Sequence, residues 1–223
     1  AGDMLAMVED DYYPVECSDQ AFFLNAGIVF DANEVQEHIE EHAVPHSAAL
    51  LARVRETQSP YFTGALARVN ASWQNLGQNA KVAAAKAGLR PPEANPFMNN
   101  VAQAVEIVDA LDRCADLCRK LAEPGAIASS SLPVPFEVKA GRAVGFTEAP
   151  RGALFHDLTL DAEGRVTHAS ILTPTAQNVA NLEADMRLLA EKLVADGAAE
   201  DVVRLEIEKL VRAYDPCLSC SVH

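Results

Sequence analysis

The feature that most constrains the fold is a long amphipathic segment between Asn95 and Leu121. Its apolar positions recur at steps of three and four residues: Val101, Val105, Val108, Leu111, Ala115 and Cys118. This is the spacing of one face of an α-helix, so the segment predicts a helix of about seven turns. Asn95-Pro96 is a start signal, and Pro124-Gly125 is a stop signal. We expect this helix to be the main strut of a bundle.

Other segments divide into helical and extended patterns. Helical patterns cover residues 31–45, 47–56, about 72–87, 177–195 and 199–213. Extended patterns cover 142–147, 153–160 and 165–172, and one or two short strands are expected within 1–30. A Ser/Pro-rich connector occupies 126–135. The sequence therefore predicts a mainly α fold, a bundle of long helices with a small β-hairpin or sheet.

Charge and hydropathy exclude several classes of protein. The 18 basic and 32 acidic residues give a formal charge of −14, which repels phosphate backbones and anionic lipid. We therefore expect no nucleic-acid partner. No run approaches the roughly 18 apolar residues of a membrane span, and residues 1–10 have neither the basic start nor the apolar core of a signal peptide. An odd number of cysteines, five, does not suggest a disulfide framework, so a cytoplasmic location is expected.

The last nine residues carry the strongest chemical signal, Asp215-Pro216-Cys217-Leu218-Ser219-Cys220-Ser221-Val222-His223. Two thiols three positions apart, followed three positions later by an imidazole, form a cluster of soft ligands that favours a transition metal. Pro216 disfavours helix at Asp215, so the preceding helix should end there and present Cys217 on a turn.

Other uses of these cysteines remain open. A thioredoxin-like redox pair would need a helix after the two thiols, but only three residues follow Cys220. A zinc knuckle would need a fourth ligand, which Cys17, Cys114 or Cys118 could supply. Cys17 is more simply a structural or surface thiol, and Cys114 and Cys118 are more simply small buried thiols on one helix face.

Three histidines, His38, His42 and His46, recur every four residues. They would stack on one helix face and could bind a metal if the helix continued. Pro45 stands where that helix should stop, and the acidic residues around the histidines fit a solvated face equally well. The solvated face is the favoured interpretation.

The tail resembles the end of the mature large subunit of nickel-iron hydrogenases. In that family the two cysteines are half of a four-thiolate cradle for a nickel-iron centre. Three further segments resemble parts of this family. Residues 145–154 resemble its Glu-Ala-Pro-Arg-Gly motif, residues 171–175 resemble a strand end beside the iron, and residues 61–70 resemble a structural segment. The resemblance implies that residues 1–223 are the C-terminal part of such a subunit. Its segments would be a helical bundle (30–125), a β-hairpin with the Pro-Arg-Gly motif (126–176), and closing helices with the metal-binding tail (177–223).

The resemblance also implies roles for individual residues. Cys217 would be a terminal nickel thiolate, and Cys220 would bridge nickel and iron. Arg151 would lie over the open face of the metals, with Asp215 as its anchor. Its structural alternative is an arginine that satisfies hairpin carbonyl groups.

The iron of the family carries cyanide and carbon monoxide. Thr175 would donate to a cyanide, and Leu154, Thr173 and Pro174 would shape the carbon monoxide pocket beside Pro150. His223 would bind a magnesium-like ion together with the backbone carbonyl of Ile171 and a glutamate from the other half of the subunit.

The sequence departs from the family in one respect, because the N-terminal Arg-x-Cys-Gly-x-Cys motif is absent. This chain would thus supply two of four thiolates, and the missing N-terminal half would be a separate polypeptide, another segment, or lost. Electrons would leave through an iron-sulfur small subunit and further electron-transfer subunits, because no cluster-binding cysteine set is present. Ser219 resembles the cytoplasmic, cofactor-coupled hydrogenases. The alternative function is a non-catalytic, zinc-type metal-binding or assembly module derived from a hydrogenase.

Overall fold

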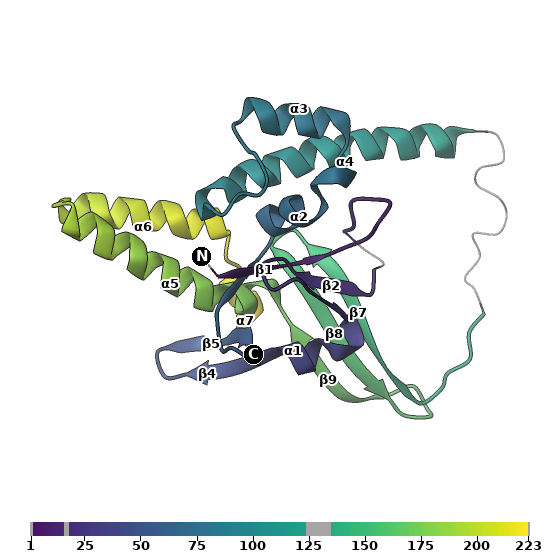
Figure 1. The fold of residues 1–223 in the computed structure, drawn as a ribbon. Coiled ribbons are helices and arrows are strands. Elements are labelled where there is room, and N and C mark those ends of the chain that lie inside the picture. The colour runs from purple at the N-terminus through teal and green to yellow at the C-terminus, as the bar shows by residue number, and fades with distance from the viewer. Residues whose placement is uncertain (1, 16–17, 124–134, 223) are drawn as a thin grey trace.

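A computed structural model describes residues 2–15, 18–123 and 135–222 of the chain, and Figure 1 shows its fold. The helices are α1 (Val35–His38), α2 (Ala65–Ser72), α3 (Gln78–Lys86), α4 (Asn99–Ala122), α5 (Pro174–Ala195), α6 (Glu200–Tyr214) and α7 (Leu218–Ser221), with 3-10 turns η1 (Ala32–Glu34), η2 (Trp73–Asn75) and η3 (Pro96–Met98). The strands are β1 (Asp3–Met7), β2 (Gln20–Phe23), β3 (Ile28–Asp31), β4 (Ile39–Val44), β5 (Ser47–Val54), β6 (Tyr61–Thr63), β7 (Gly141–Ala149), β8 (Gly152–Leu160) and β9 (Val166–Leu172). The predictions for Cys17, for His223 and for most of the connector lie outside the described residues.

The strands form small sheets rather than one large one. One sheet has the order β3-β2-β1-β6, β4 pairs with β5, and β7, β8 and β9 form a three-stranded sheet. β1 and β6 run parallel, and the other pairs are antiparallel. Long helices lie around these sheets, as predicted for a mainly α fold. No helix in the described part of the chain combines the length and the hydropathy that a membrane span requires.

Two hydrophobic clusters hold the fold together. The first joins β1 and α2 to α3, α4, the middle of α5 and the end of α6, and includes Leu66, Val105 and Tyr214. The second joins the four-stranded sheet to β7 and β8, where Phe146 stacks on Phe155 with ring centroids 4.3 Å apart. Each apolar side chain of this size that is fully buried contributes about 1.5–3 kcal/mol. The strands β7 and β8 on either side of the turn at Arg151 are thus anchored in the second cluster.

Local signals start and stop the long helices, although α5 begins at Pro174 rather than at the predicted Gln177. The Asn95 side chain accepts a hydrogen bond from the backbone N–H of Phe97, and Pro96 occupies the first position of η3, which leads into α4. Thr173 caps α5 in the same way, with Pro174 as its first residue. α6 ends at Asp215, whose backbone is left-handed with φ 49°, and Pro216 follows it.

Two helices predicted in the first quarter of the chain are strands instead. Only one helical turn, α1, forms within residues 31–45, and it is followed directly by β4. Residues 47–54 form β5, which pairs with β4 from Ile39 opposite Val54 to Val44 opposite Ser47. The apolar spacing in residues 31–56 fits the period of a helix and also that of a strand. Pairing between the two segments selects the extended conformation. Three strands, not one or two, lie among the described residues up to Asp31.

The histidine face expected on a continuous helix does not form. His38 ends α1 and stacks on Phe30, with ring centroids 4.3 Å apart. His42 lies on β4, and His46 pairs with Glu183 at 3.0 Å. The metal-binding interpretation of these histidines is therefore wrong for this fold.

The long helix is present, but only its first half is packed. Ala102 and Val105 are buried, whereas Leu111 is 65% exposed and Ala115 and Cys118 are exposed as well. Cys114 and Cys118 are thus not the buried thiols that the sequence suggested. Figure 1 shows the reason, since α4 extends past the sheets and the neighbouring helices.

Candidate metal centre

The predicted cysteine tail forms a short ordered segment. α6 delivers it, Asp215 turns the chain, and Cys217 precedes α7. The backbone N–H of Cys217 donates to the hydroxyl oxygen of Thr175 at 3.0 Å. Val222 makes an antiparallel bridge with Ala49 on β5. The tail is therefore held from two sides, by the start of α5 and by a sheet edge.

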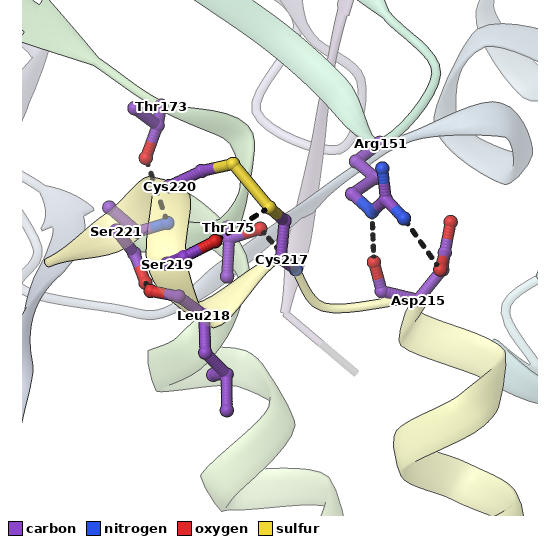
Figure 2. The surroundings of a disulfide bond; sticks show 10 residues. Arg151, Thr173, Thr175, Asp215, Cys217, Leu218, Ser219, Cys220 and Ser221 are labelled. Carbon is purple, nitrogen blue, oxygen red and sulfur yellow. Dashed lines mark hydrogen bonds and ion pairs between the residues drawn. A yellow bond between two sulfur atoms is a disulfide. The ribbon is translucent and has the colours of Figure 1, made fainter.

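Cys217 and Cys220 are joined by a disulfide, with their Cα atoms 5.4 Å apart (Figure 2). The sequence predicted thiolates at these two positions and did not suggest a disulfide framework, so this bond was not expected. Both sulfurs lie on one side of the turn, where one metal centre could bind them together. A metal binds thiolates, so the pair has to be reduced by two electrons before it can act as a ligand set.

Arg151 reaches the tail from the turn between β7 and β8. Its Nε donates to the backbone carbonyl of Asp215 at 2.6 Å, and its Nη2 donates to the Asp215 carboxylate at 3.1 Å (Figure 2). The predicted anchor of this guanidinium is thus present. The alternative, an arginine that satisfies hairpin carbonyl groups, does not describe these bonds. The side chain remains 38% exposed, so its open face is available to a ligand.

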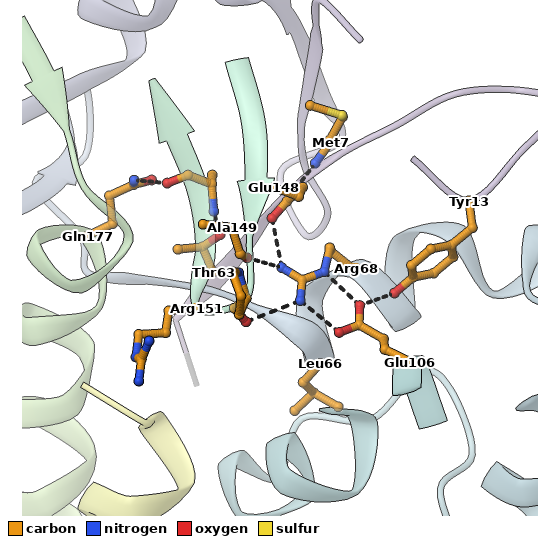
Figure 3. Close-up of polar contacts among 12 residues, drawn as sticks. Met7, Tyr13, Thr63, Leu66, Arg68, Glu106, Glu148, Ala149, Arg151 and Gln177 are labelled. Carbon is orange, nitrogen blue, oxygen red and sulfur yellow. Dashed lines mark hydrogen bonds and ion pairs between the residues drawn. The ribbon is translucent and has the colours of Figure 1, made fainter. Parts of the chain in front are cut away.

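A second arginine, Arg68 on α2, holds the turn that carries Arg151. It is 4% exposed, and it donates to the carbonyl oxygens of Ala149 at 3.0 Å and Pro150 at 3.3 Å (Figure 3). These are the two residues before Arg151. Arg68 is thus placed to fix where Arg151 leaves the turn.

Two carboxylates balance the buried charge of Arg68. Glu106 on α4 accepts from its Nε at 2.6 Å and from its Nη2 at 2.7 Å, and Glu148 accepts from its Nη1 at 2.9 Å. Burial raises the pKa of Glu148, while Arg68 and the backbone N–H of Met7 offset part of that rise. Burial acts to lower the pKa of Arg68, but Glu106 and Glu148 outweigh it and raise this pKa above its usual value.

The other side of the turn packs against β6 and α5. Gly152 has φ 133°, and a Cβ atom there would lie 2.5 Å from the Thr63 side chain. The Thr63 hydroxyl accepts from the backbone N–H of Ala153 at 2.9 Å. Asn178 on α5 exchanges hydrogen bonds with both backbone groups of Thr63 at 2.9 Å and 2.8 Å. Only glycine therefore fits at position 152 without displacing its neighbours.

The remaining predicted site residues lie on the elements around this turn. Thr173, Pro174 and Thr175 start α5, and Thr175 contacts the tail directly. Leu154 lies on β8, opposite Thr147 of β7. Ile171 lies near the end of β9, opposite His156, and is 40% exposed.

Four residues of this region were not singled out from the sequence: Arg68, Glu106, Glu148 and Gln177. The Gln177 side chain is fully buried and donates to the carbonyl of Ala153 at 2.6 Å. Arg68 had a signal, since it stands alone as a charge in the apolar run from Ala65 to Val69. Glu148 had one too, since it is the glutamate of the matched Glu-Ala-Pro-Arg-Gly motif. Glu106 lies among the polar positions of a long helix, where a glutamate carries no signal.

The described residues do not form a complete metal site by themselves. Within 2–15, 18–123 and 135–222, no three His, Cys, Asp or Glu side chains come close enough to hold an ion. The cysteine pair nevertheless fits half of a thiolate cradle, because its two sulfurs converge and its surroundings are fixed. Further ligands would have to come from another part of the protein.

Comparison with known proteins identifies the family. A family model described as nickel-dependent hydrogenase matches residues 55–223. Sulfhydrogenase 1 subunit alpha of Pyrococcus furiosus is 39% identical over 204 residues, which is 88% of this chain and 44% of that protein. The NAD-reducing hydrogenase HoxS subunit beta of Cupriavidus necator is 35% identical over 127 residues, 56% of this chain and 25% of that protein. The chain thus spans less than half the length of these relatives.

Solved structures share the fold. An NAD+-reducing NiFe-hydrogenase in the H2-reduced state matches with a TM-score of 0.76 and 22% identity, over 100% of this chain and 50% of that one. A reduced, active Ni-Fe-Se hydrogenase from Desulfomicrobium baculatum matches with a TM-score of 0.62 and 20% identity, over 99% of this chain and 52% of that one. The chain belongs to the nickel-dependent hydrogenase family, and it corresponds to about half of a hydrogenase large subunit.

Proposed function

We propose that this chain is one half of the catalytic subunit of a nickel-iron hydrogenase, which interconverts hydrogen with protons and electrons. One observation carries the proposal. The Arg151 turn, the start of α5 and the end of α6 are far apart in the sequence, and all three meet at the Cys217–Cys220 pair (Figure 2). Such convergence around two thiols is typical of a site and unnecessary for a structural disulfide.

In the reduced protein, Cys217 and Cys220 would be two of the four thiolates that hold nickel and iron. When bound, the nickel-iron centre supplies an electron-rich, open metal site for the uneven splitting of hydrogen. The other two thiolates would come from the N-terminal half that the relatives contain in addition. Cyanide and carbon monoxide on the iron are part of this proposal.

The chain would position a positive charge beside that centre. Arg151 is held by Asp215 and keeps an exposed guanidinium face. A fixed guanidinium can donate to a cyanide and stabilise charge that develops during the reaction, and it needs no reorganisation to do so. Pro150 and Gly152 make this placement rigid, since proline fixes φ and glycine permits the close approach to Thr63.

Thr175 would have two tasks. Its hydroxyl oxygen accepts the N–H of Cys217, and the hydroxyl hydrogen remains able to donate to the second cyanide. Thr173 and Pro174 beside it, with Leu154 from β8, would shape the pocket around carbon monoxide. Ile171 would offer its carbonyl to a magnesium-like ion shared with His223.

The proposed complex contains further chains. The complementary half of the large subunit and an iron-sulfur small subunit would complete the electron path, with more electron-transfer subunits beyond it. A cytoplasmic location, as expected from the sequence, suits thiols that must stay reduced to bind metal.

Metal analysis with infrared spectroscopy tests the proposal. The chain would be purified under reducing, anaerobic conditions together with its complementary half. Nickel and iron in equal amounts, with cyanide and carbonyl bands and hydrogen uptake, are expected. Zinc, or no metal, in protein that has both halves would contradict the catalytic role and favour the non-catalytic module.

A further inference from the structure

Beyond Arg113, which donates to the carbonyl oxygen of Tyr13, α4 has no packing partner in the described structure. Every residue from Cys114 to Ala122 is exposed, and Figure 1 shows this part of α4 running clear of the sheets and helices. Helices in proteins are stabilised mainly by packing of an apolar face, since short helices alone are marginal in water. A free helical end of this length therefore indicates a surface built for something that covers it.

The exposed part of α4 carries a regular apolar seam. We call the five residues Ile107, Leu111, Cys114, Cys118 and Leu121 the α4 seam. They follow each other at steps of four, three, four and three, which is the heptad spacing of helix-to-helix contacts. Ile107, Leu111 and Leu121 are 61%, 65% and 56% exposed, and both cysteines are free and exposed. The seam is about 21 Å long.

The seam is too wide for a simple two-helix contact. The positions that flank it in the heptad are also apolar. Val108 packs against the chain's own core, whereas Ala110, Ala115 and Leu117 are exposed. Two-stranded coiled coils place charged residues there, whereas a helix inside a bundle is apolar at these positions too. Leu117 is itself 55% exposed. The pattern fits burial against at least two helices.

A groove continues the seam toward Arg68 and its two carboxylate partners, Glu106 and Glu148. It has a volume of about 460 Å³ and lies between Ile107 and Ala110 of α4, Val15, and the strand end at Ala149 and Pro150. Arg68, Glu106 and Glu148 are among the residues that line it. Whatever covers the seam can therefore also seal the buried ion pairs behind the Arg151 turn from water.

We propose that the α4 seam and this groove are the docking surface for the complementary half of the hydrogenase large subunit, and that helices of that half cover them. The inference rests on the proposed function for the identity of the occupant. The relatives are more than twice as long as the part that this chain matches, since 88% of the chain covers only 44% of the sulfhydrogenase subunit. The unmatched part of that subunit is longer than the matched 44% and remains to be placed. An α4 seam with apolar flanks fits cover by two helices of that part better than by one helix of a second copy.

The two seam cysteines provide a native probe of the contact. The chain would be alkylated with iodoacetamide, alone and mixed with a polypeptide that contains the part of Pyrococcus furiosus sulfhydrogenase 1 subunit alpha that it does not match. Peptide mass spectrometry would then give the labelling rates of Cys114 and Cys118. At least tenfold slower labelling of both thiols in the mixture is expected. Unchanged rates would overturn the proposal, and protection in the chain alone at high concentration would assign the seam to a second copy instead.

A substitution in the seam gives an independent measurement. Leu111→Glu should weaken association with the same polypeptide by about ten- to a hundredfold, the effect of keeping one leucine out of a buried contact. Leu188→Glu on α5 is the matched control, because Leu188 is 60% exposed and lies outside the seam. Its dissociation constant should change less than threefold. Equal weakening by both variants, or by neither, would overturn the assignment of the seam.

These measurements need neither metal nor activity. A mixture in which the thiols are protected but no nickel binds would support the docking surface and contradict the proposed function. A mixture that binds nickel and iron while the seam cysteines stay reactive would support the proposed function and contradict the docking surface.

Discussion

Removal of the buried charge of Arg68 tests how the site is held. Arg68→Met keeps an unbranched side chain but leaves Glu148, whose side chain is fully buried, without the cation that now bonds to it at 2.9 Å. Breaking a buried ion pair by removing one member typically costs about 3–5 kcal/mol, because the other charge stays buried. The carbonyls of Ala149 and Pro150 lose their donor as well. We expect a loss of about 3–5 kcal/mol in the free energy of unfolding at neutral pH.

The pH dependence of this loss has a defined sign. Burial already raises the pKa of Glu148 in the folded chain, and removal of Arg68 takes away a group that lowers it. The folded variant then binds a proton that the unfolded chain, with a glutamate pKa of about 4.3, releases. Its stability therefore falls as pH rises toward the folded pKa. The deficit relative to the natural chain should be largest near neutral pH and smaller near pH 5.

Urea unfolding followed by circular dichroism at both pH values would measure this deficit. Arg204→Met is the control, because Arg204 pairs with Glu208 at 3.9 Å and the two side chains are 77% and 56% exposed, and an exposed pair contributes less than about 1 kcal/mol. Addition of Glu148→Gln to Arg68→Met should recover part of the loss. A deficit below about 1 kcal/mol, or one that grows at acid pH, would refute the assignment of a buried, charged clamp.

Three further predictions concern the turn and the tail. Arg151→Lys should leave the nickel content of the assembled enzyme intact while hydrogen turnover falls about 10²- to 10³-fold. Arg165→Lys, at an exposed arginine, is the control and should not change turnover. Unchanged turnover in Arg151→Lys would contradict the proposed role of the guanidinium. Gly152→Ala should lower the free energy of unfolding by roughly 1–3 kcal/mol because of its φ of 133° and its contact with Thr63, whereas Gly141→Ala, with nothing within 4 Å of its new Cβ, should be close to neutral. Thr175→Val removes the acceptor of the Cys217 N–H. An unsatisfied amide loses about 1–3 kcal/mol, so hydrogen exchange of the Cys217 amide should become about tenfold faster or more. An unchanged exchange rate would show that the bond does not order the tail.

The helices with their own start and stop signals were predictable from the sequence. α4, α5 and α6 have capping residues, proline or an apolar period that no neighbour overrides. The strands β4 and β5 were not predictable, because their apolar spacing fits a helix and only their mutual pairing makes them extended. The exposure of the second half of α4 was also hidden, since a periodic pattern shows which face is apolar but not what covers it.

The site was predictable where a motif carried it. The resemblance selected Arg151, Asp215 and Thr175, and the structure brings all three to Cys217. Their roles toward a metal remain predictions. Arg68 and its carboxylates were missed because their importance depends on contacts between α2, α4 and β7, which are distant in the sequence. Local patterns contain no record of such contacts.

Nickel X-ray absorption tests the central claim most directly. The chain, assembled anaerobically with its complementary half, should show nickel bound mainly by sulfur, and Cys217→Ser should replace one sulfur neighbour by oxygen. The Cys114→Ser variant, altered at an exposed free thiol, should leave the spectrum unchanged. A nickel spectrum that does not respond to Cys217→Ser, or a Cys217–Cys220 disulfide that persists in protein loaded with nickel, would contradict the assignment of these thiols to the metal centre.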